Sequence, residues 1–358
     1  MTIARTSCCQ LSVVALSVLL CISTFSPAQS TSRPTTAASN PTTSPSGTNA
    51  DAVRRLREAV DQYYSYRDLR NVPWDTLFNH YTPLLERAET PRQFAEHAAK
   101  MLAVARDIHV SVKIDDETIG GFRRDVKRNY DLAALAQQVP AWKDLSSQVS
   151  TGRLPKGIGY VLIKSWRKDE QQVLKPALAA LRDLTDTHSL IIDVRPNGGG
   201  SEPFAQKVAG CFVDQPVVYA KHITRDPSAE GGWTPIRDRT LTPNPDQPGY
   251  RGKVAVLMGE VNMSSCESFL LMMKQVPNCK LIGEKSYGSS GNPKPHDLGN
   301  GVVVSLPSWK DLTPDGTPLE GKGIEPDIVV RATPQELQTR DPVLQAAIDW
   351  INGTCKVP

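Results

Sequence analysis

A serine at the start of a predicted helix is the first candidate for chemistry in this chain. Ser264 follows the apolar run 253–258, which reads as a buried strand, and precedes residues 265–276, which are rich in Phe, Leu and Met and predict a helix. A hydroxyl at such a turn faces solvent, and the free N–H groups of the first helical turn point to where an oxyanion would form. The alternative is structural, because Ser264 and Glu267 have the spacing of an N-terminal capping box.

His109 is the second candidate, since a neutral imidazole can accept a serine proton near physiological pH. Strict alternation over residues 106–114 predicts a strand with Val110, Val112 and Ile114 on its apolar face, which leaves His109 on the opposite face. For this residue alone a hydrogen-bonded structural role is the alternative. We expect that role for the other five histidines, which are His80, His97, His188, His222 and His296.

Three consecutive glycines form the third feature. Gly198, Gly199 and Gly200 follow a predicted buried strand over residues 189–194. Glycines at this position let backbone N–H groups approach a ligand closely, which serves a phosphate nest and an oxyanion hole equally well. The loop lacks the lysine of a Walker motif and the spacing of a dinucleotide fingerprint.

The elements around these residues indicate an α/β protein. Strands over 157–166 and 189–194 enclose a helix over 169–184, interrupted or restarted at Pro176, and so predict a β-α-β unit. We expect Asp193 and Arg195 to hold the glycine loop through an ion pair.

Helices are predicted at both ends of the folded region. Amphipathic helices begin at Asp51 and at Thr90-Pro91, where Thr90 and Gln93 have a capping-box pattern. The segment before about residue 106 is therefore expected to be helical. A last helix over 341–351 turns four residues inward, which are Val343, Leu344, Ala347 and Ile351.

The N-terminal 50 residues predict export. One Arg, an apolar run of 15 residues over 11–25 and the small residues Ser26-Pro27-Ala28 follow the plan of a secretory signal peptide, with cleavage expected after Ala28. The run is shorter than the roughly 18 to 20 residues that span a bilayer, so no stable membrane insertion is expected after cleavage. Residues 29–50 are Ser-, Thr- and Pro-rich and predict a disordered linker.

Composition excludes several classes of function. The chain has 358 residues, a formal net charge of +3 and 22% charged residues, so it offers no basic field for nucleic acid. No H-E-x-x-H, C-x-x-C or carboxylate cluster points to a metal, and no cofactor is expected. Two disulfides could form among the four cysteines beyond residue 28, which are Cys211, Cys266, Cys279 and Cys355. We expect Cys266 to pack as a small apolar residue instead.

Several segments in a fixed order carry a family resemblance. They are the D-x-H segment with His109, GIGYVLIKSW, IIDVRPNGGG, the serine of NMSSCES, SYGSSGNP, LPSWKDLTPDG and LEGKGIEPDIVV. Over roughly residues 100–332 the chain resembles the S41 peptidase family, which includes the C-terminal (tail-specific) processing peptidases and the tricorn core protease. The resemblance implies a crotonase-like ββα spiral of the ClpP/crotonase type over 116–332. A small helical region over 51–115 would precede it, and a C-terminal segment with a closing helix over 333–358 would follow.

By position, the family's nucleophile falls on Ser264. The resemblance implies oxyanion donors at Gly199 or its neighbour Gly200 and at the backbone N–H of Ser265. It also places the loop Ser289, Ser290 and Gly291 at the substrate.

Two activation schemes occur in the family. In the processing peptidases a lysine activates the serine, but that position holds Ser289 here, and Lys285 and Lys294 are off register. In the tricorn-like branch a histidine is the base and a glutamate orients it, which implies His109 and Glu320. Asp107 is the competing orienter, although local turn chemistry is its simpler role.

One departure concerns substrate choice. The processing peptidases usually insert a PDZ domain of about 80 to 100 residues, and only 47 residues lie between His109 and Gly157. No PDZ domain is therefore expected in this interval.

The sequence thus predicts an exported serine peptidase, periplasmic or extracellular, that acts on peptide or protein substrates through an acyl-enzyme. An oligomer is compatible with this prediction. The alternative is a non-catalytic ligand- or peptide-binding protein on the same fold, because fold does not fix function. Acyl-CoA chemistry of the crotonase type conflicts with the export signal.

Overall fold

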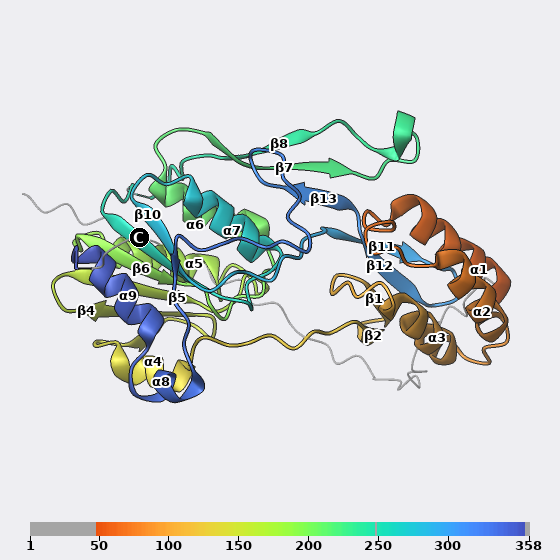
Figure 1. Cartoon of the computed structure of the whole chain (residues 1–358), viewed down its shortest axis with the longest axis horizontal. Coiled ribbons are helices and arrows are strands. Elements are labelled where there is room, and N and C mark those ends of the chain that lie inside the picture. Colours follow the sequence, from red (N-terminus) through yellow and green to blue (C-terminus); the bar gives the residue numbers. More distant parts are fainter. Residues whose placement is uncertain (1–47, 248, 355–358) are drawn as a thin grey trace, which may run out of the picture. The chain divides into compact units, whose positions relative to one another are not determined.

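The computed structural model describes residues 48–247 and 249–354, and Figure 1 shows the order of their elements. The predicted signal peptide lies outside the described residues, as does the predicted linker up to residue 47. Helix α1 (Asn49–Glu58) begins inside the predicted linker, because Thr48 caps it by accepting the Asp51 N–H. Among the described helices, none is both long and apolar enough to cross a membrane.

A seven-stranded mixed sheet carries the candidate serine and the glycine loop. Strands β5, β6, β9, β10 and β14 run parallel to one another. Strands β4 and β3 extend one edge of the sheet by antiparallel pairing. The predicted β-α-β unit is confirmed by the parallel pairing of β5 with β6 across helix α5. The strand order is β14 (Ile328–Val329), β10 (Cys279–Gly283), β9 (Lys253–Met258), β6 (Ser189–Asp193), β5 (Ile158–Ile163), β4 (Val149–Leu154) and β3 (Lys143–Asp144).

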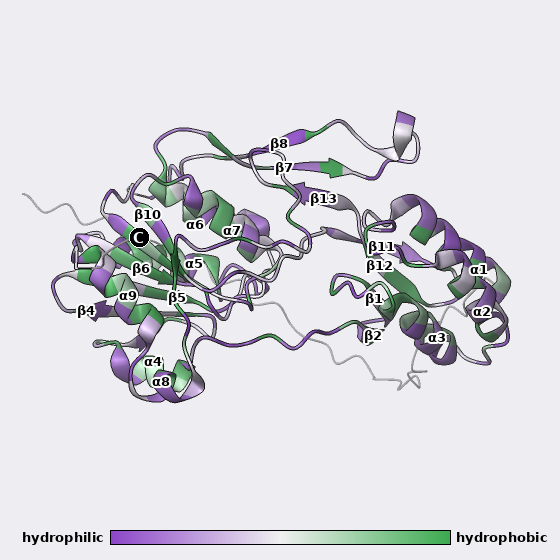
Figure 2. Ribbon diagram, viewed as in Figure 1, coloured by the Kyte–Doolittle hydropathy of each residue, from purple (hydrophilic) through white to green (hydrophobic). Residues whose placement is uncertain are grey.

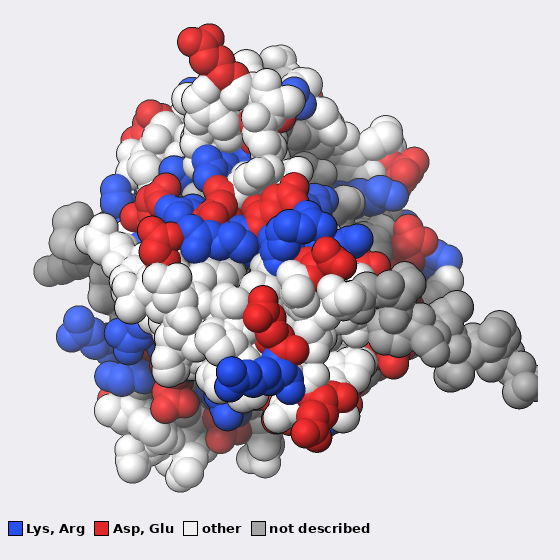
Figure 3. Space-filling view, turned by 90° about the vertical axis from the view of Figure 1, so that its right-hand side faces the viewer, with Lys and Arg blue, Asp and Glu red and all other residues white. Residues whose placement is uncertain are grey.

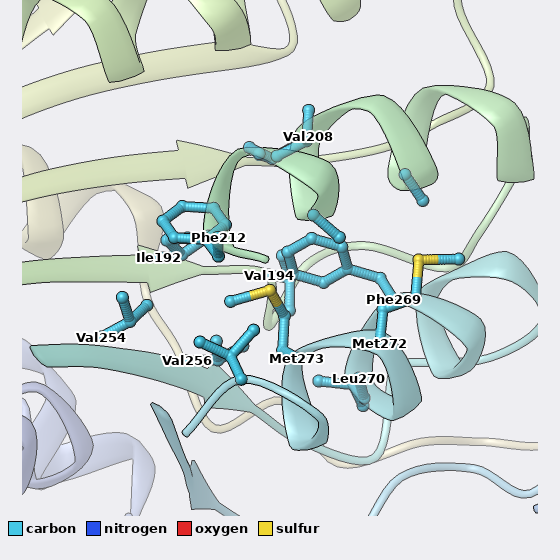
Figure 4. Packing of buried hydrophobic residues seen from close by; sticks show 14 of the residues in the cluster. Ile192, Val194, Val208, Phe212, Val254, Val256, Phe269, Leu270, Met272 and Met273 are labelled. Atoms are coloured by element: carbon cyan, nitrogen blue, oxygen red, sulfur yellow. The ribbon is translucent and has the colours of Figure 1, made fainter. Parts of the chain in front are cut away.

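Both faces of this sheet are covered by helices, as parallel strands require. In β6, Leu190 and Ile192 belong to one apolar cluster, whereas Ile191 belongs to the other, so the strand alternates with a period of two. Figure 4 shows the first cluster, where Ile192 packs with Phe269 and Met273 of the serine-bearing helix. The helices are α5 (Leu174–Asp183), α6 (Glu202–Ala209) and α7 (Ser265–Lys274) on this side, with α4 (Leu132–Gln138) and α9 (Pro342–Ile351) contributing to the other cluster.

Helix α5 begins later than predicted. Residues 170–173 form turns, and the helix starts at Leu174 with Pro176 in its first turn. Proline lacks a backbone N–H, but in the first turn this removes no helical hydrogen bond, because the first N–H groups of a helix have no intrahelical partner. The predicted closing helix is confirmed, since Asp341 caps α9 and the four residues expected to face inward are buried.

The segment that carries His109 belongs to a separate core. Strand β1 (Ser111–Ile114) lies in a four-stranded antiparallel sheet, and its strands β1 and β12 share an apolar cluster with the N-terminal helices. The division of the chain at residues 115 and 332 stays a prediction. The other strands are β2 (Glu117–Gly121), β11 (Pro293–Asp297) and β12 (Val303–Pro307). The helices are α1, the π-helix η1 (Ala59–Tyr63), α2 (Trp74–Glu86) and α3 (Pro91–Ala103).

A third sheet, of three strands, also contributes to the candidate site described below. Its order is β13 (Trp309–Leu312), β7 (Val217–Thr224) and β8 (Arg237–Leu241). The remaining elements are the short helices η2 (Gly210–Phe212), η3 (Glu230–Gly232) and α8 (Pro334–Thr339).

Apolar and charged residues are sorted as a folded core requires. The central strands and the inner sides of the helices are hydrophobic, and the polar residues lie along the connections and outer helix faces (Figure 2). On the face shown in Figure 3, Lys and Arg side chains alternate with Asp and Glu side chains in one band. Among the described residues, Arg67 forms ion pairs with Asp61 and Asp68.

Candidate active site

Ser264 lies at the turn between β9 and α7, as predicted. Its backbone has φ 57° and ψ −133°, and its side chain makes no capping hydrogen bond, so the capping-box alternative is wrong. A positive φ in a residue other than glycine costs about 1 to 3 kcal/mol and persists only where the surroundings hold it. Here the Ser264 N–H donates to the carbonyl of Ser289 at 2.8 Å.

Glu267 performs a different task from the predicted cap. Its carboxylate is fully buried and accepts from the Ser286 hydroxyl, the Gly288 N–H at 2.8 Å and the Ser289 N–H at 2.9 Å. Burial raises the pKa of Glu267 to about 8, against the opposing effect of these hydrogen bonds. One turn beyond the serine, this carboxyl therefore fixes the loop that supports Ser264. Sequence reasoning missed it, although a glutamate in an otherwise apolar helix was a signal.

His109 meets the same loop. It lies in the turn before β1, and its Nδ1 is 3.1 Å from the Ser289 hydroxyl oxygen. Burial lowers the pKa of His109, and nearby Asp107 opposes this effect. No direct hydrogen bond between His109 and Ser264 is present in this structure, and Ser289 contacts both residues.

Asp107 is the carboxylate nearest to the imidazole. One of its oxygens accepts the His109 N–H at 2.9 Å and lies 3.9 Å from Nδ1, and the other accepts the Tyr64 hydroxyl at 2.8 Å. The predicted turn chemistry of Asp107 is therefore present, and it comes together with proximity to the ring.

Glu320 reaches the site from the opposite end of the chain but makes no hydrogen bond with His109. Its two oxygens accept from Arg70 at 2.8 Å and from the Ser290 N–H at 3.0 Å. Burial and the nearby charge of Asp107 raise the pKa of Glu320 to about 7. Arg70 was not predicted from the sequence, because no local pattern distinguishes it from other surface arginines.

The glycine loop touches the serine. A Cβ atom at Gly199 would lie 2.9 Å from the Ser264 Cβ and 3.3 Å from the Ser265 nitrogen, so only glycine fits. The Gly199 N–H donates to the side-chain oxygen of Asn197 at 2.9 Å. This predicted oxyanion donor is therefore already engaged in a hydrogen bond. Within the described residues, the N–H groups of Gly200 and Ser265 make no hydrogen bond and are the free donors at the site.

The predicted ion pair beneath this loop is confirmed. Arg195 and Asp193 are both fully buried and lie 2.7 Å apart. The Arg195 guanidinium also donates to Asp341, the cap of α9, at 3.0 Å and to the Asn129 carbonyl at 2.7 Å. Two carboxylates and a carbonyl thus compensate one buried charge.

A pocket of about 490 Å³ opens beside the serine. Helices α6 and α7, the glycine loop and the strands β8 and β13 contribute to it. Of the loop predicted to bind substrate, Ser290 lines this pocket, whereas Ser289 and Gly291 do not. Ser289 is buried, and Gly291 packs on Pro307. The lining residues are Gly200, Ser201, Glu202, Pro203, Gln206, Arg239, Ser264, Ser265, Ser268, Ser290, Asn292, Pro293 and Trp309.

The cysteines of the described residues form no disulfide. Cys211, Cys266 and Cys279 are buried and free, so a disulfide among these three is wrong, and Cys355 lies outside the described residues. Cys266 packs in the core as expected. Lys285 is exposed and pairs with Glu325 at 2.7 Å.

Comparisons with known proteins relate parts of this chain to peptidases. Residues 157–330 match the family model of peptidase family S41, and residues 54–103 match that of the Tricorn protease C1 domain. A curated protein of Staphylococcus epidermidis, named Probable CtpA-like serine protease, is 26% identical over 178 residues, which is 50% of this chain and 34% of that protein. The chain thus spans about a third of the length of the curated relatives it matches.

Solved structures share the fold. A peptidase candidate from Parabacteroides merdae superposes with a TM-score of 0.72 at 22% identity, over 85% of this chain and 97% of that chain. The photosystem II D1 C-terminal processing protease superposes with a TM-score of 0.52 at 16% identity, over 84% and 96% of the two chains. At these identities the likeness concerns the mixed α/β fold.

Proposed function

We propose, from the premise that this chain is a member of peptidase family S41, that it hydrolyses peptide bonds through an acyl-enzyme on Ser264. The observation that carries the proposal is the placement of this hydroxyl at a left-handed turn between the glycine loop and the first turn of α7. Gly200 and Ser265, whose N–H groups make no hydrogen bond within the described residues, line the same pocket as Ser264. They would stabilise the oxyanion that forms when the serine attacks a carbonyl.

His109 is the general base in this proposal. Because burial lowers its pKa, the imidazole is neutral at physiological pH and can accept the serine proton. With its Nδ1 hydrogen-bonded to Ser289, the ring leaves Nε2 for the nucleophile. The protonated imidazole would then donate to the leaving amine. Catalytic hydrogen bonds are often long in proteins without substrate and tighten in the complex, which accounts for the missing contact between His109 and Ser264.

Two carboxylates share the orienting role in this proposal. Asp107 holds the backbone of His109 and lies closest to its ring. Glu320 holds the Ser290 N–H and so acts on the imidazole through the neighbouring Ser289. The expected direct contact of Glu320 with His109 is replaced by this indirect one.

The wider context of the proposal rests on the sequence. The mixed sheet with helices on both faces is compatible with a crotonase-like spiral. The first 28 residues support export to the periplasm or the exterior. Peptides or proteins are the substrates that the family implies.

A fluorophosphonate probe tests the proposal. We expect it to label Ser264 in the purified protein, with mass spectrometry locating the adduct. Labelling should be lost in Ser264→Ala and fall strongly in His109→Ala. The exposed residues Ser228 and His80 provide matched control variants, Ser228→Ala and His80→Ala, which should label normally.

Absence of an adduct on well-folded wild-type protein would overturn the catalytic proposal. It would favour the non-catalytic binding protein. Full labelling of His109→Ala would leave a serine hydrolase but remove the histidine from the mechanism.

A further inference from the structure

We infer that the pocket beside Ser264 receives a positively charged side chain, a lysine or arginine on the acyl side of the bond that is cut. The inference rests on the proposed function and adds the substrate class. It is carried by the pocket's position, by a carboxylate oxygen of Glu202 whose one hydrogen bond is long, and by the charge balance of Glu202, Arg239 and Asp311.

The position assigns the pocket to the acyl side. Its lining includes Ser264, Gly200 and Ser265, the groups that would hold the attacked carbonyl, but it does not include His109. The base must reach the leaving amine to protonate it. A pocket that contains the nucleophile and the oxyanion donors without the base therefore takes the side chain of the acyl half.

Glu202 offers a free acceptor to this pocket. Its Oε1 accepts from the Arg239 Nε at 3.1 Å and from the Tyr219 hydroxyl. Its Oε2 has one partner, a long 3.5 Å contact with the Ser268 hydroxyl. The side chain is 19% exposed, so this oxygen is within reach of a ligand that donates hydrogen bonds.

The positive charge of Arg239 does not make the net charge at the pocket positive. Its guanidinium is buried and engages Glu202, Asp311 at 2.6 Å and Ser268 at 2.7 Å, and it lies 4.7 Å from the centre of the Trp309 ring. Its donors are thus directed at protein groups instead of a substrate carboxylate. One guanidinium between two carboxylates leaves a formal charge of −1.

No other residue of the pocket lining adds a positive charge. Glu202 and Arg239 are the ionisable residues of the lining. The His222 ring contacts that of Trp309 at a tilt of 47° with ring centres 4.9 Å apart, and burial lowers the pKa of His222, so it is neutral near pH 7. The first turn of α6 carries Glu202 itself, which offsets the positive end of that helix.

The remaining walls fit a long aliphatic stem with a polar tip. Pro203, Pro293 and Trp309 supply apolar surface. The Ser265 hydroxyl is buried and has no hydrogen-bond partner among the described residues, so it is a second free acceptor. An ammonium group carries three donors and no acceptor, which matches Glu202 and Ser265.

Fluorogenic peptides that differ only in the residue before the cut bond test the inference. Lysine is compared with norleucine, which has the same stem without the charge, and with arginine, leucine and glutamate. We expect kcat/KM for lysine and arginine to exceed that for norleucine by about 10- to 100-fold, and glutamate to be the poorest. In Glu202→Gln the ratio of lysine to norleucine should fall toward one. Thermal melting monitors folding of the variant.

The outcomes separate the two proposals. If wild-type protein labels at Ser264 but cleaves norleucine as well as lysine, the pocket assignment is overturned and the peptidase proposal stands. If it neither labels nor cleaves any peptide, both are overturned. The wild-type comparison decides the inference even if Glu202→Gln fails to fold.

Discussion

The Nδ1 atom of His109 lies 3.1 Å from the hydroxyl oxygen of Ser289, a residue 180 positions further along the chain. The carbonyl of Ser289 accepts the N–H of Ser264, and its own N–H donates to Glu267. One buried serine therefore connects the proposed base, the proposed nucleophile and a buried carboxyl. By the resemblance to the S41 family, it falls at the position where the processing peptidases carry a lysine.

Replacing Ser289 by alanine should slow catalysis without removing the fold. The variant loses the hydrogen bond to His109 but keeps both backbone contacts, so we expect kcat to fall by about 10- to 100-fold with little change in KM. The loss of stability should be about 1 kcal/mol. Steady-state kinetics and denaturant titration check this. Partial recovery of kcat in Ser289→Thr would support positioning, whereas an unchanged kcat in Ser289→Ala would contradict it.

Substitution of Gly199 should be far more damaging than its backbone angle alone explains. Gly199 and Gly316 have φ 94° and 89°, but a Cβ at Gly199 meets Ser264 and one at Gly316 meets nothing within 4 Å. Gly316→Ala thus measures the cost of the backbone angle, about 1 kcal/mol. We expect Gly199→Ala to cost more and to abolish labelling of Ser264. Equal stability and labelling in the two variants would contradict the steric argument.

The buried carboxyl of Glu267 should make stability depend on pH. Its folded-state pKa of about 8 exceeds the ordinary value, so between roughly pH 4.5 and 8 the folded protein binds more protons than the unfolded chain. The contribution of Glu267 is therefore full at low pH and is lost as pH rises through 8. Denaturant unfolding at several pH values should show a shallower decline over this range in Glu267→Gln than in wild type. An identical slope in both proteins would refute the assignment.

Activity should show an acid limb set by His109. Because burial lowers its pKa from the ordinary 6.5, the neutral base persists below that pH, and kcat/KM should fall only as pH drops further. The pH profile of kcat/KM, recorded where melting shows the protein to be folded, tests this. An acid limb above pH 6.5 would indicate a different titrating group.

Cutting the buried ion network at Asp341 should destabilise the protein strongly. Asp341→Ala removes one of two carboxylates from the Arg195 charge and also the cap of α9, for a loss of about 3 to 5 kcal/mol. The matched control is Asp186→Ala, which breaks an exposed pair with Arg153 and should change little. Urea denaturation compares the two variants. A small loss in Asp341→Ala would mean that the network relaxes around Arg195.

The sequence allowed the local parts of this site to be predicted. Apolar runs placed β6 and β9 within a residue of their observed ends, and the turn at Ser264 followed from them. The spacing of Ser264 and Glu267 was ambiguous, because a capping box and a loop clamp use the same two residues. The choice between them is made by residues 286–289, which local periodicity does not relate to the helix.

The ion cluster beside the pocket was not predictable for a related reason. Glu202, Arg239 and Asp311 come from α6, β8 and β13, and each is an ordinary charged residue in its own segment. Only tertiary packing brings them together. The same holds for Arg70, which reaches Glu320 over 250 residues.

The pairing of β1 with β12 has a consequence for how the protein assembles. Ser111 lies opposite Ser305, so the sheet behind His109 closes only after most of the chain has been synthesised. Contacts between such distant residues slow folding, because the chain loses the conformational entropy of a long loop before these contacts can form. A nascent chain that already contains both His109 and Ser264 therefore still lacks β12, the strand that pairs with β1 directly after His109, and the proposed active site stays incomplete until that strand is available.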